Sequence, residues 1–158
     1  MKHLLLSLLF MCFSIILAAQ IVPGNYAGTM YLSPTTMGQD SMHVQLNIVC
    51  INDTLFQFKM TYDSNSVKDY QIIQKEASIV LDEKNGILLP GSLENNELHF
   101  HYRVNNRHFQ VLYRFNADGS LDLDLHFYSP GEKINRGDFE IQGYPNEGRQ
   151  RAHLLKTP

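Results

Sequence analysis

Residues 97–128 contain three short segments in which apolar and polar side chains alternate with almost no exception. The segments read ELHFHYRV at 97–104, FQVLYRF at 109–115 and LDLDLHF at 121–127. Alternation with a period of two is typical of β-strands that bury one face and expose the other to water. The pattern therefore predicts antiparallel strands, and it limits the fold class more tightly than any other feature of the chain.

Two turns between these segments predict which residues face each other. The loop Ala117-Asp118-Gly119 ends on the glycine that a three-residue hairpin favours, and Asn105-Asn106 suits a two-residue turn because Asn tolerates positive φ. With these turns, Tyr102 faces Phe109 and Phe109 faces Phe127. Any register shifted by one residue would pair apolar residues with polar ones, so the two turns predict one consistent sheet.

The same alternation continues upstream and predicts about eight strands. The expected strands are 24–32, 42–50, 56–62, 69–82, 86–93, 97–104, 107–115 and 121–128, with a further candidate at 138–143. Residues 69–82 are long for one strand and the parity of their apolar residues changes, which predicts a bulge or bend at 73–76.

Short loops between many such strands favour an all-β fold, an antiparallel up-and-down (meander) β-barrel, because closure removes exposed edges. A two-sheet β-sandwich is the alternative. It requires longer crossing connections, and only 33–40, 63–68 and 129–137 are long enough.

The first 19 residues predict a signal peptide. Lys2 gives a basic start, residues 4–17 form an apolar run, and Ala18-Ala19 supply small residues before the expected cleavage after Ala19. This predicts a secreted or periplasmic protein with no stable membrane insertion after cleavage. The alternatives are an uncleaved anchor and a lipoprotein attached at Cys12, which Met11 disfavours because it is not small.

The rest of the chain is expected to form one domain. Residues 20–145 are assigned to the barrel, and the polar residues 146–158 to a loosely ordered C-terminal tail, with a short binding segment as the alternative. The net charge is −3, and loss of Lys2 leaves 12 basic residues against 16 acids, or −4. This acidic balance argues against nucleic acid as a partner. Cys50 lies on an apolar strand face and is expected to be an inert, buried thiol.

The segment Gly24-Asn25-Tyr26-Ala27-Gly28-Thr29 opens the first expected strand. It resembles the Gly-x-Trp start of lipocalins and other calycins, with Tyr26 at the Trp position, and the Gly-x-Tyr-x-Gly-Thr start of small bacterial calycin-like exported proteins. The resemblance implies a barrel whose central cup binds a small, often hydrophobic molecule. The chain departs from lipocalins because it has no Trp and lacks the expected disulfide. Arg136 is the candidate for the late basic residue that covers the lipocalin Trp.

The apolar face of the expected barrel points inward and supports two interpretations, a ligand cup and a filled core. The residues predicted to contact a ligand are Tyr26, Phe56, Phe58, Tyr62, Phe100, Tyr102, Phe109, Tyr113 and Phe127. Four tyrosines would place their hydroxyl groups inside the barrel, away from water: Tyr26, Tyr62, Tyr102 and Tyr113. Each of these needs a partner, because an unpaired buried hydroxyl costs about 1–3 kcal/mol. This requirement favours a pocket with a few polar groups over a filled core.

The histidines that could bind a metal ion lie on the solvent-exposed face of the expected sheet. His99 and His101 share that face of one strand, and His126 lies two strands away from His101. A separation of about 9–10 Å is too great for two nitrogens to share one metal ion. No metal or cofactor site is therefore predicted.

Acidic side chains on the same face give little support for catalysis. Glu97, Arg114 and Asp122 are expected to form a row of charges across three strands, and Asp124 lies beside them. No nucleophile-elbow or phosphate-loop motif occurs. An isomerase or hydrolase that uses the barrel interior is therefore the least favoured function.

The favoured hypothesis is an exported protein that binds a small hydrophobic or aromatic molecule in the manner of a lipocalin. The alternative is a filled barrel that acts through its surface as an envelope, interaction or inhibitor protein.

Overall fold

The computed structural model describes residues 20–36, 39–63, 66–75, 78–131, 133–136, 139–142 and 146–158, and for 34–36, 39, 133–136 and 139–142 it describes the backbone only. The expected signal peptide at 1–19 lies outside the described residues. The strands are β1 (Gly24–Thr36), β2 (Gln39–Asn52), β3 (Leu55–Tyr62), β4 (Val67–Lys75), β5 (Ser78–Asp82), β6 (Leu88–Glu94), β7 (Glu97–Val104), β8 (Arg107–Phe115), β9 (Leu121–Ser129), β10 (Lys133–Arg136), β11 (Phe139–Gln142) and β12 (Asn146–Thr157). The described residues contain no helix that could cross a membrane.

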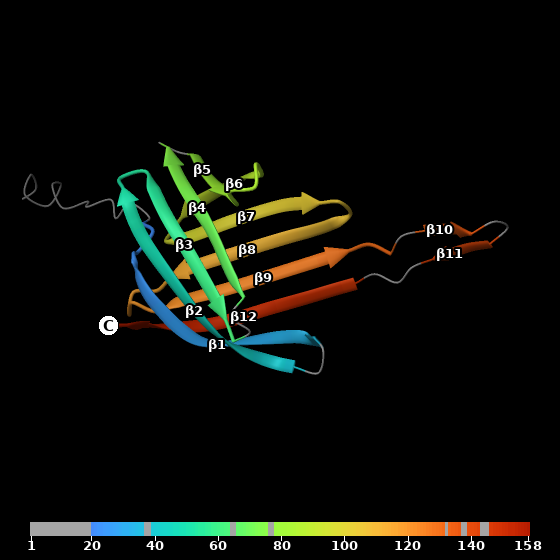
Figure 1. The fold of residues 1–158 in the computed structure, drawn as a ribbon, viewed down its shortest axis with the longest axis horizontal. Helices are drawn as coiled ribbons and strands as arrows, with labels where there is room; N and C mark the ends of the chain where they lie inside the picture. Colours follow the sequence, from blue (N-terminus) through green and yellow to red (C-terminus); the bar gives the residue numbers. More distant parts are fainter. Residues whose placement is uncertain are drawn as a thin grey trace, which may run out of the picture.

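Ten of these strands form a closed antiparallel barrel (Figure 1). Going around the barrel, the order is β1-β12-β9-β8-β7-β6-β5-β4-β3-β2, so nearly every strand pairs with its neighbour in sequence. The expected meander barrel is confirmed, and the sandwich is not formed.

The predicted register of the central hairpins is also confirmed. Tyr102 pairs with Phe109, and Phe109 pairs with Phe127. The turn residues adopt the backbone that the sequence requires, because Asn105 has φ 55° and Gly119 has φ 86°.

The barrel has ten strands rather than eight, and the first reason lies in residues 69–82. These residues form two antiparallel strands, β4 and β5, instead of one bulged strand. Lys75 pairs with Ser78, and Ile72 pairs with Leu81, so the chain reverses direction between them. The change in apolar parity marked this reversal and was wrongly interpreted as a bend.

The second reason is β12, which occupies the region expected to be a loose polar tail. That expectation is wrong. β12 pairs with β9 on one side and with β1 on the other, and these two ladders close the barrel. Its residues alternate between the core and solvent: Ala152 and Leu154 are buried, whereas Arg151 and Leu155 are exposed.

β10 and β11 form a separate two-stranded sheet outside the barrel. Figure 1 shows this hairpin projecting beyond the ends of β9 and β12. The further strand expected at 138–143 therefore corresponds to β11, which pairs with β10 instead of joining the barrel. Arg136 lies at the end of β10 and so outside the barrel sheet.

One end of the barrel is closed by the segment that precedes β1. Ile21 is buried among the core residues, and the backbone N–H of Gln20 donates to the Asn96 side chain at 3.2 Å. The Tyr26 hydroxyl donates to the carbonyl of Val22 at 2.9 Å, so this predicted inward hydroxyl has a backbone partner. We call this the closed end.

Cys50 lies near the closed end and is exposed, which corrects the expectation of a buried thiol. It is the last alternating residue of β2, next to an irregularity in pairing between Cys50 and Asn52. Because the regular ladder stops here, the side chain lies beyond the packed core, and its Sγ is 3.3 Å from the carbonyl oxygen of Asn52.

The β6–β7 ladder is short, and it ends before the opposite end of the barrel. β6 pairs with β7 only from Gly91–Phe100 to Glu94–Glu97, so β7 residues 101–104 pair with β8 alone. Pro90 directly precedes this ladder, and proline has no backbone N–H to donate to it. No ladder pair therefore joins β6 and β7 at this end, next to the inward-facing Tyr102.

Candidate functional site

The nine residues predicted to contact a ligand divide into two groups. Tyr26, Phe56, Phe58, Phe100 and Tyr113 are buried in the core, and Tyr62, Tyr102, Phe109 and Phe127 are half-buried. The half-buried group lies at the end of the barrel opposite the closed end. We call these four residues the aromatic mouth.

Three rings of the aromatic mouth form a row across neighbouring strands. The rings of Tyr102 and Phe109 stack with centroids 5.1 Å apart, and those of Phe109 and Phe127 are 6.3 Å apart. All three belong to the inward-facing rows of β7, β8 and β9, yet each stays partly accessible. Aromatic side chains with an accessible inward face provide stacking surface for a flat apolar molecule.

The row of rings ends on a glycine of β12. Gly148 pairs with Phe127, and a Cβ added at Gly148 would lie 2.3 Å from an atom of the Phe127 ring. The absence of a side chain at Gly148 therefore lets this ring lie flat against β12. Because any larger residue would displace the ring, Gly148 helps to set the shape of the mouth.

An open groove of about 580 Å³ lies beside the aromatic mouth. It is lined by Val104, Asn105, Asn106, Arg107, Phe109, Ser129 and Pro130. These residues come from the β7–β8 turn and from the end of β9. The Phe109 side chain thus belongs both to the row of rings and to a groove large enough for a small organic molecule.

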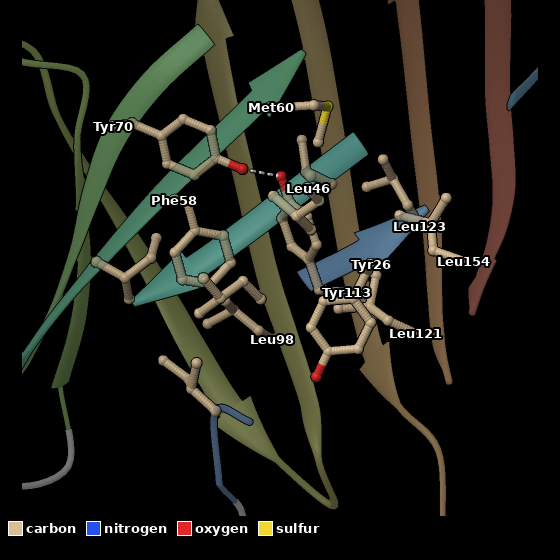
Figure 2. Packing of buried hydrophobic residues seen from close by; sticks show 14 of the residues in the cluster. Tyr26, Leu46, Phe58, Met60, Tyr70, Leu98, Tyr113, Leu121, Leu123 and Leu154 are labelled. Carbon is tan, nitrogen blue, oxygen red and sulfur yellow. Dashed lines mark hydrogen bonds between the residues drawn. The ribbon is translucent and has the colours of Figure 1, made fainter. Parts of the chain in front are cut away.

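Below the aromatic mouth, two tyrosines from opposite sides of the barrel share a hydrogen bond. Figure 2 shows the hydroxyls of Tyr70 on β4 and Tyr113 on β8 meeting in the core. The Phe58 ring packs against both, with ring centroids 5.4 Å from Tyr70 and 5.7 Å from Tyr113. Both tyrosines of this Tyr70–Tyr113 pair are buried in the core.

The pair stays uncharged at physiological pH. Burial raises the pKa of both Tyr70 and Tyr113 above the ordinary value for tyrosine. Negative charge on Tyr62 or Tyr102 would raise both pKa values further. The pair therefore acts as a neutral hydrogen-bonding group.

Tyr70 was not among the predicted contact residues, although a signal for it was present. It alternates with Ile72 on β4 and faces inward, as Phe58 does on β3. The misassigned strand at 69–82 concealed this, because its change in parity left the inward face of that segment undefined.

The outer face of β7, β8, β9 and β12 carries a network of charged and polar side chains. The predicted pair between Glu97 and Arg114 is formed at 2.7 Å. Asp122 instead accepts from His153 at 2.6 Å, so the expected row of three charges is only partly bridged. Arg149 binds both carboxylate oxygens of Asp124, one of them at 2.7 Å.

Two shallow grooves of about 410 and 550 Å³ cross this outer face. They share Leu112, Asp124 and Arg149, and His99, His101 and His126 line the smaller one. Within the described part of the chain, no three His, Cys, Asp or Glu side chains gather closely enough to hold a metal ion.

The ion pairs on this face lead to a prediction for acid stability. The hydrogen bond from Arg149 holds the pKa of Asp124 below its usual range, and Arg114 does the same for Glu97. A lowered folded-state pKa gives stability above the unfolded-state pKa, about 4, and that stability is lost as the pH falls through the folded-state value. Urea unfolding at pH 5 to 3 should therefore show a smaller loss for Asp124→Asn than for wild type. An equal loss of stability in both proteins would contradict a stabilising role for the ion pair between Asp124 and Arg149.

Comparison with protein-family models, with curated proteins and with solved structures found no match to this chain. The functional argument therefore depends on the geometry of the barrel.

Proposed function

We propose that this protein is an exported, calycin-like barrel that binds one small hydrophobic or aromatic molecule at the aromatic mouth. The observation that carries the proposal is the contrast between the two ends of the barrel. One end is covered by the segment containing the buried Ile21, whereas the other leaves Tyr102, Phe109 and Phe127 half-buried. Inward-facing aromatic rings that remain accessible are typical of a ligand pocket with a few polar groups.

Two further features support the same site. The β6–β7 ladder stops before the mouth, so Tyr102 lies where β7 pairs with β8 alone. A ten-stranded barrel also encloses more space than an eight-stranded one, since the diameter grows with the number of strands. Both features favour access for a small molecule at this end.

The alternative function, action through the surface, has one specific observation in its favour. The outer face of β7, β8, β9 and β12 is grooved and carries paired charges, including Asp124 with Arg149. These cations and acids neutralise one another, so the face has no strong charge of one sign to attract a partner. We therefore place the ligand at the aromatic mouth.

Native mass spectrometry tests the proposed function. The full chain is expressed in a bacterial host, purified after export without detergent, and measured intact and after denaturation. We expect an adduct of one small molecule that disappears on denaturation. Absence of any adduct, together with no thermal stabilisation by a panel of aromatic and aliphatic compounds, would contradict the proposal.

The flat aromatic hydrocarbon 2-ethylnaphthalene serves as a probe ligand for the aromatic mouth. Phe109→Ala is expected to weaken its binding by about tenfold or more, because Phe109 contacts both neighbouring rings and lines the groove. Isothermal titration calorimetry measures the effect. Tyr31→Ala is the matched control, since Tyr31 is an aromatic residue that is 65% exposed. Equal affinities for wild type and Phe109→Ala would place the ligand elsewhere.

A further inference from the structure

The Tyr70–Tyr113 pair has one more hydrogen-bond donor than it uses. Each hydroxyl carries one proton, and the bond between the two oxygens consumes only one of them. Among the described residues, neither oxygen has a second hydrogen-bond partner, and Tyr70 and Tyr113 are 8% and 4% exposed. One buried O–H group therefore lacks an acceptor, and such groups in folded proteins normally have one.

The described surroundings of the pair are apolar and aromatic. Phe58 packs against both tyrosines, and Leu98 pairs with Tyr113 from the neighbouring strand. Neither the Phe58 side chain nor the Leu98 side chain contains an oxygen that could accept a hydrogen bond. A molecule that enters the interior can supply the acceptor that these neighbours lack.

The mouth tyrosines connect this donor to the proposed ligand site. On β8, Tyr113 and Phe109 belong to the same inward row with only Val111 between them, and Phe109 pairs with Tyr102. A molecule stacked on the ring of Tyr102 at the mouth could thus extend an acceptor atom toward the pair.

We propose that the ligand is a neutral molecule with a flat apolar body and one uncharged oxygen acceptor, such as a ketone, ester or ether, which receives the spare proton of the Tyr70–Tyr113 pair. This inference rests on the proposed function and adds the chemical class of the ligand. The acceptor's oxygen satisfies the buried donor, and the apolar body contacts the rings of the aromatic mouth.

A carboxylate does not fit the same position. A buried anion needs a cation or several donors to offset the loss of its water, and the pair supplies one donor. The nearest cation on this face of β4, Lys68, is exposed and lies two residues before Tyr70. Burial raises the pKa of Tyr102 and the negative charge of Glu83 raises it further, so an acidic side chain already lies on that side of the mouth.

Three matched compounds test the inference. They are 2-acetylnaphthalene, with a neutral carbonyl; 2-ethylnaphthalene, with the same shape but no acceptor; and 2-naphthoate, which is anionic. Calorimetry on the full chain should give about tenfold tighter binding of the ketone than of the hydrocarbon, and the weakest binding for the anion. Equal affinities for ketone and hydrocarbon, or tightest binding of the anion, would overturn the inference.

The variant that isolates the pair is the double substitution Tyr70→Phe/Tyr113→Phe. It removes both hydroxyls and keeps the ring shapes, so no buried hydroxyl is left unpaired and the fold is expected to persist. Circular dichroism and thermal unfolding verify the fold. In the double variant the ketone should lose its advantage, so that the two neutral compounds bind with equal affinity.

A preference for the ketone that survives in the double variant would also overturn the inference, because the acceptor would then bind elsewhere. This result leaves the proposed function intact, since the hydrocarbon still binds. If none of the three compounds binds to wild type, the inference is overturned, and the native mass spectrometry result decides the proposed function separately.

Discussion

Leu154→Ala is expected to lower the free energy of unfolding by about 2–5 kcal/mol, a typical cost of deleting a fully buried Leu side chain. Leu154 is 0% exposed and pairs with Leu121 of β9, which is equally buried. The loss follows because β12 closes the barrel and contributes its inward residues to the core. Urea unfolding monitored by circular dichroism measures the change.

The next residue provides the matched control. Leu155 is 61% exposed on the other face of β12, and Leu155→Ala should change the stability by no more than about 0.5 kcal/mol. If residues 146–158 were a loose tail, both substitutions would have the same negligible effect. A neutral Leu154→Ala would therefore contradict the closing role of β12.

Phe58→Ala is expected to cost about 3–5 kcal/mol, the range for removal of a large aromatic side chain from a core. Phe58 is 0% exposed, and its ring supports both members of the Tyr70–Tyr113 pair. The cavity left by this substitution would remove the packing that holds the two hydroxyls together. The same unfolding experiment measures the loss.

Phe109→Ala is the control of matched chemistry for this second prediction. Phe109 also faces inward, but it is half-buried at the mouth, so less apolar surface is lost from the core. We expect its cost in stability to be at most about half that of Phe58→Ala. Comparable costs would mean that the mouth is as tightly packed as the core, and would contradict the distinction between them.

The sequence predicted the fold best where the turns contain residues that readily adopt positive φ. Gly119 and Asn105 adopt the positive φ that their turns require, and the flanking residues pair in the predicted register. In this part of the chain each inward residue is large and apolar, so a shift in register would be costly. Local turn and alternation signals agree there, and a single sequence is sufficient.

β12 was missed because its inward residues before Leu154 are small or polar and therefore give no apolar period. Gly148 faces Phe127, and Ala152 faces Leu123. The large partner supplies the volume in each pair, so the small residue is required by packing and not by its own hydrophobicity. This match between a large residue on β9 and a small one on β12 is visible only when the two strands are placed side by side.

The candidate site was predicted as a set of inward aromatic residues, and the structure divides that set by depth. Alternation identifies the face on which Tyr26 and Phe127 lie, but it does not distinguish the closed end from the mouth. That distinction depends on Ile21, which covers one end, and on the early end of the β6–β7 ladder. Both are tertiary features that no local pattern encodes.

A crystal structure of the purified full chain with 2-acetylnaphthalene tests the central claim most directly. We predict density for the ligand against the rings of Tyr102, Phe109 and Phe127, with its carbonyl oxygen within hydrogen-bonding distance of the Tyr70–Tyr113 pair. An interior and mouth completely filled by protein side chains, with the ligand absent or bound on the outer face, would contradict the account.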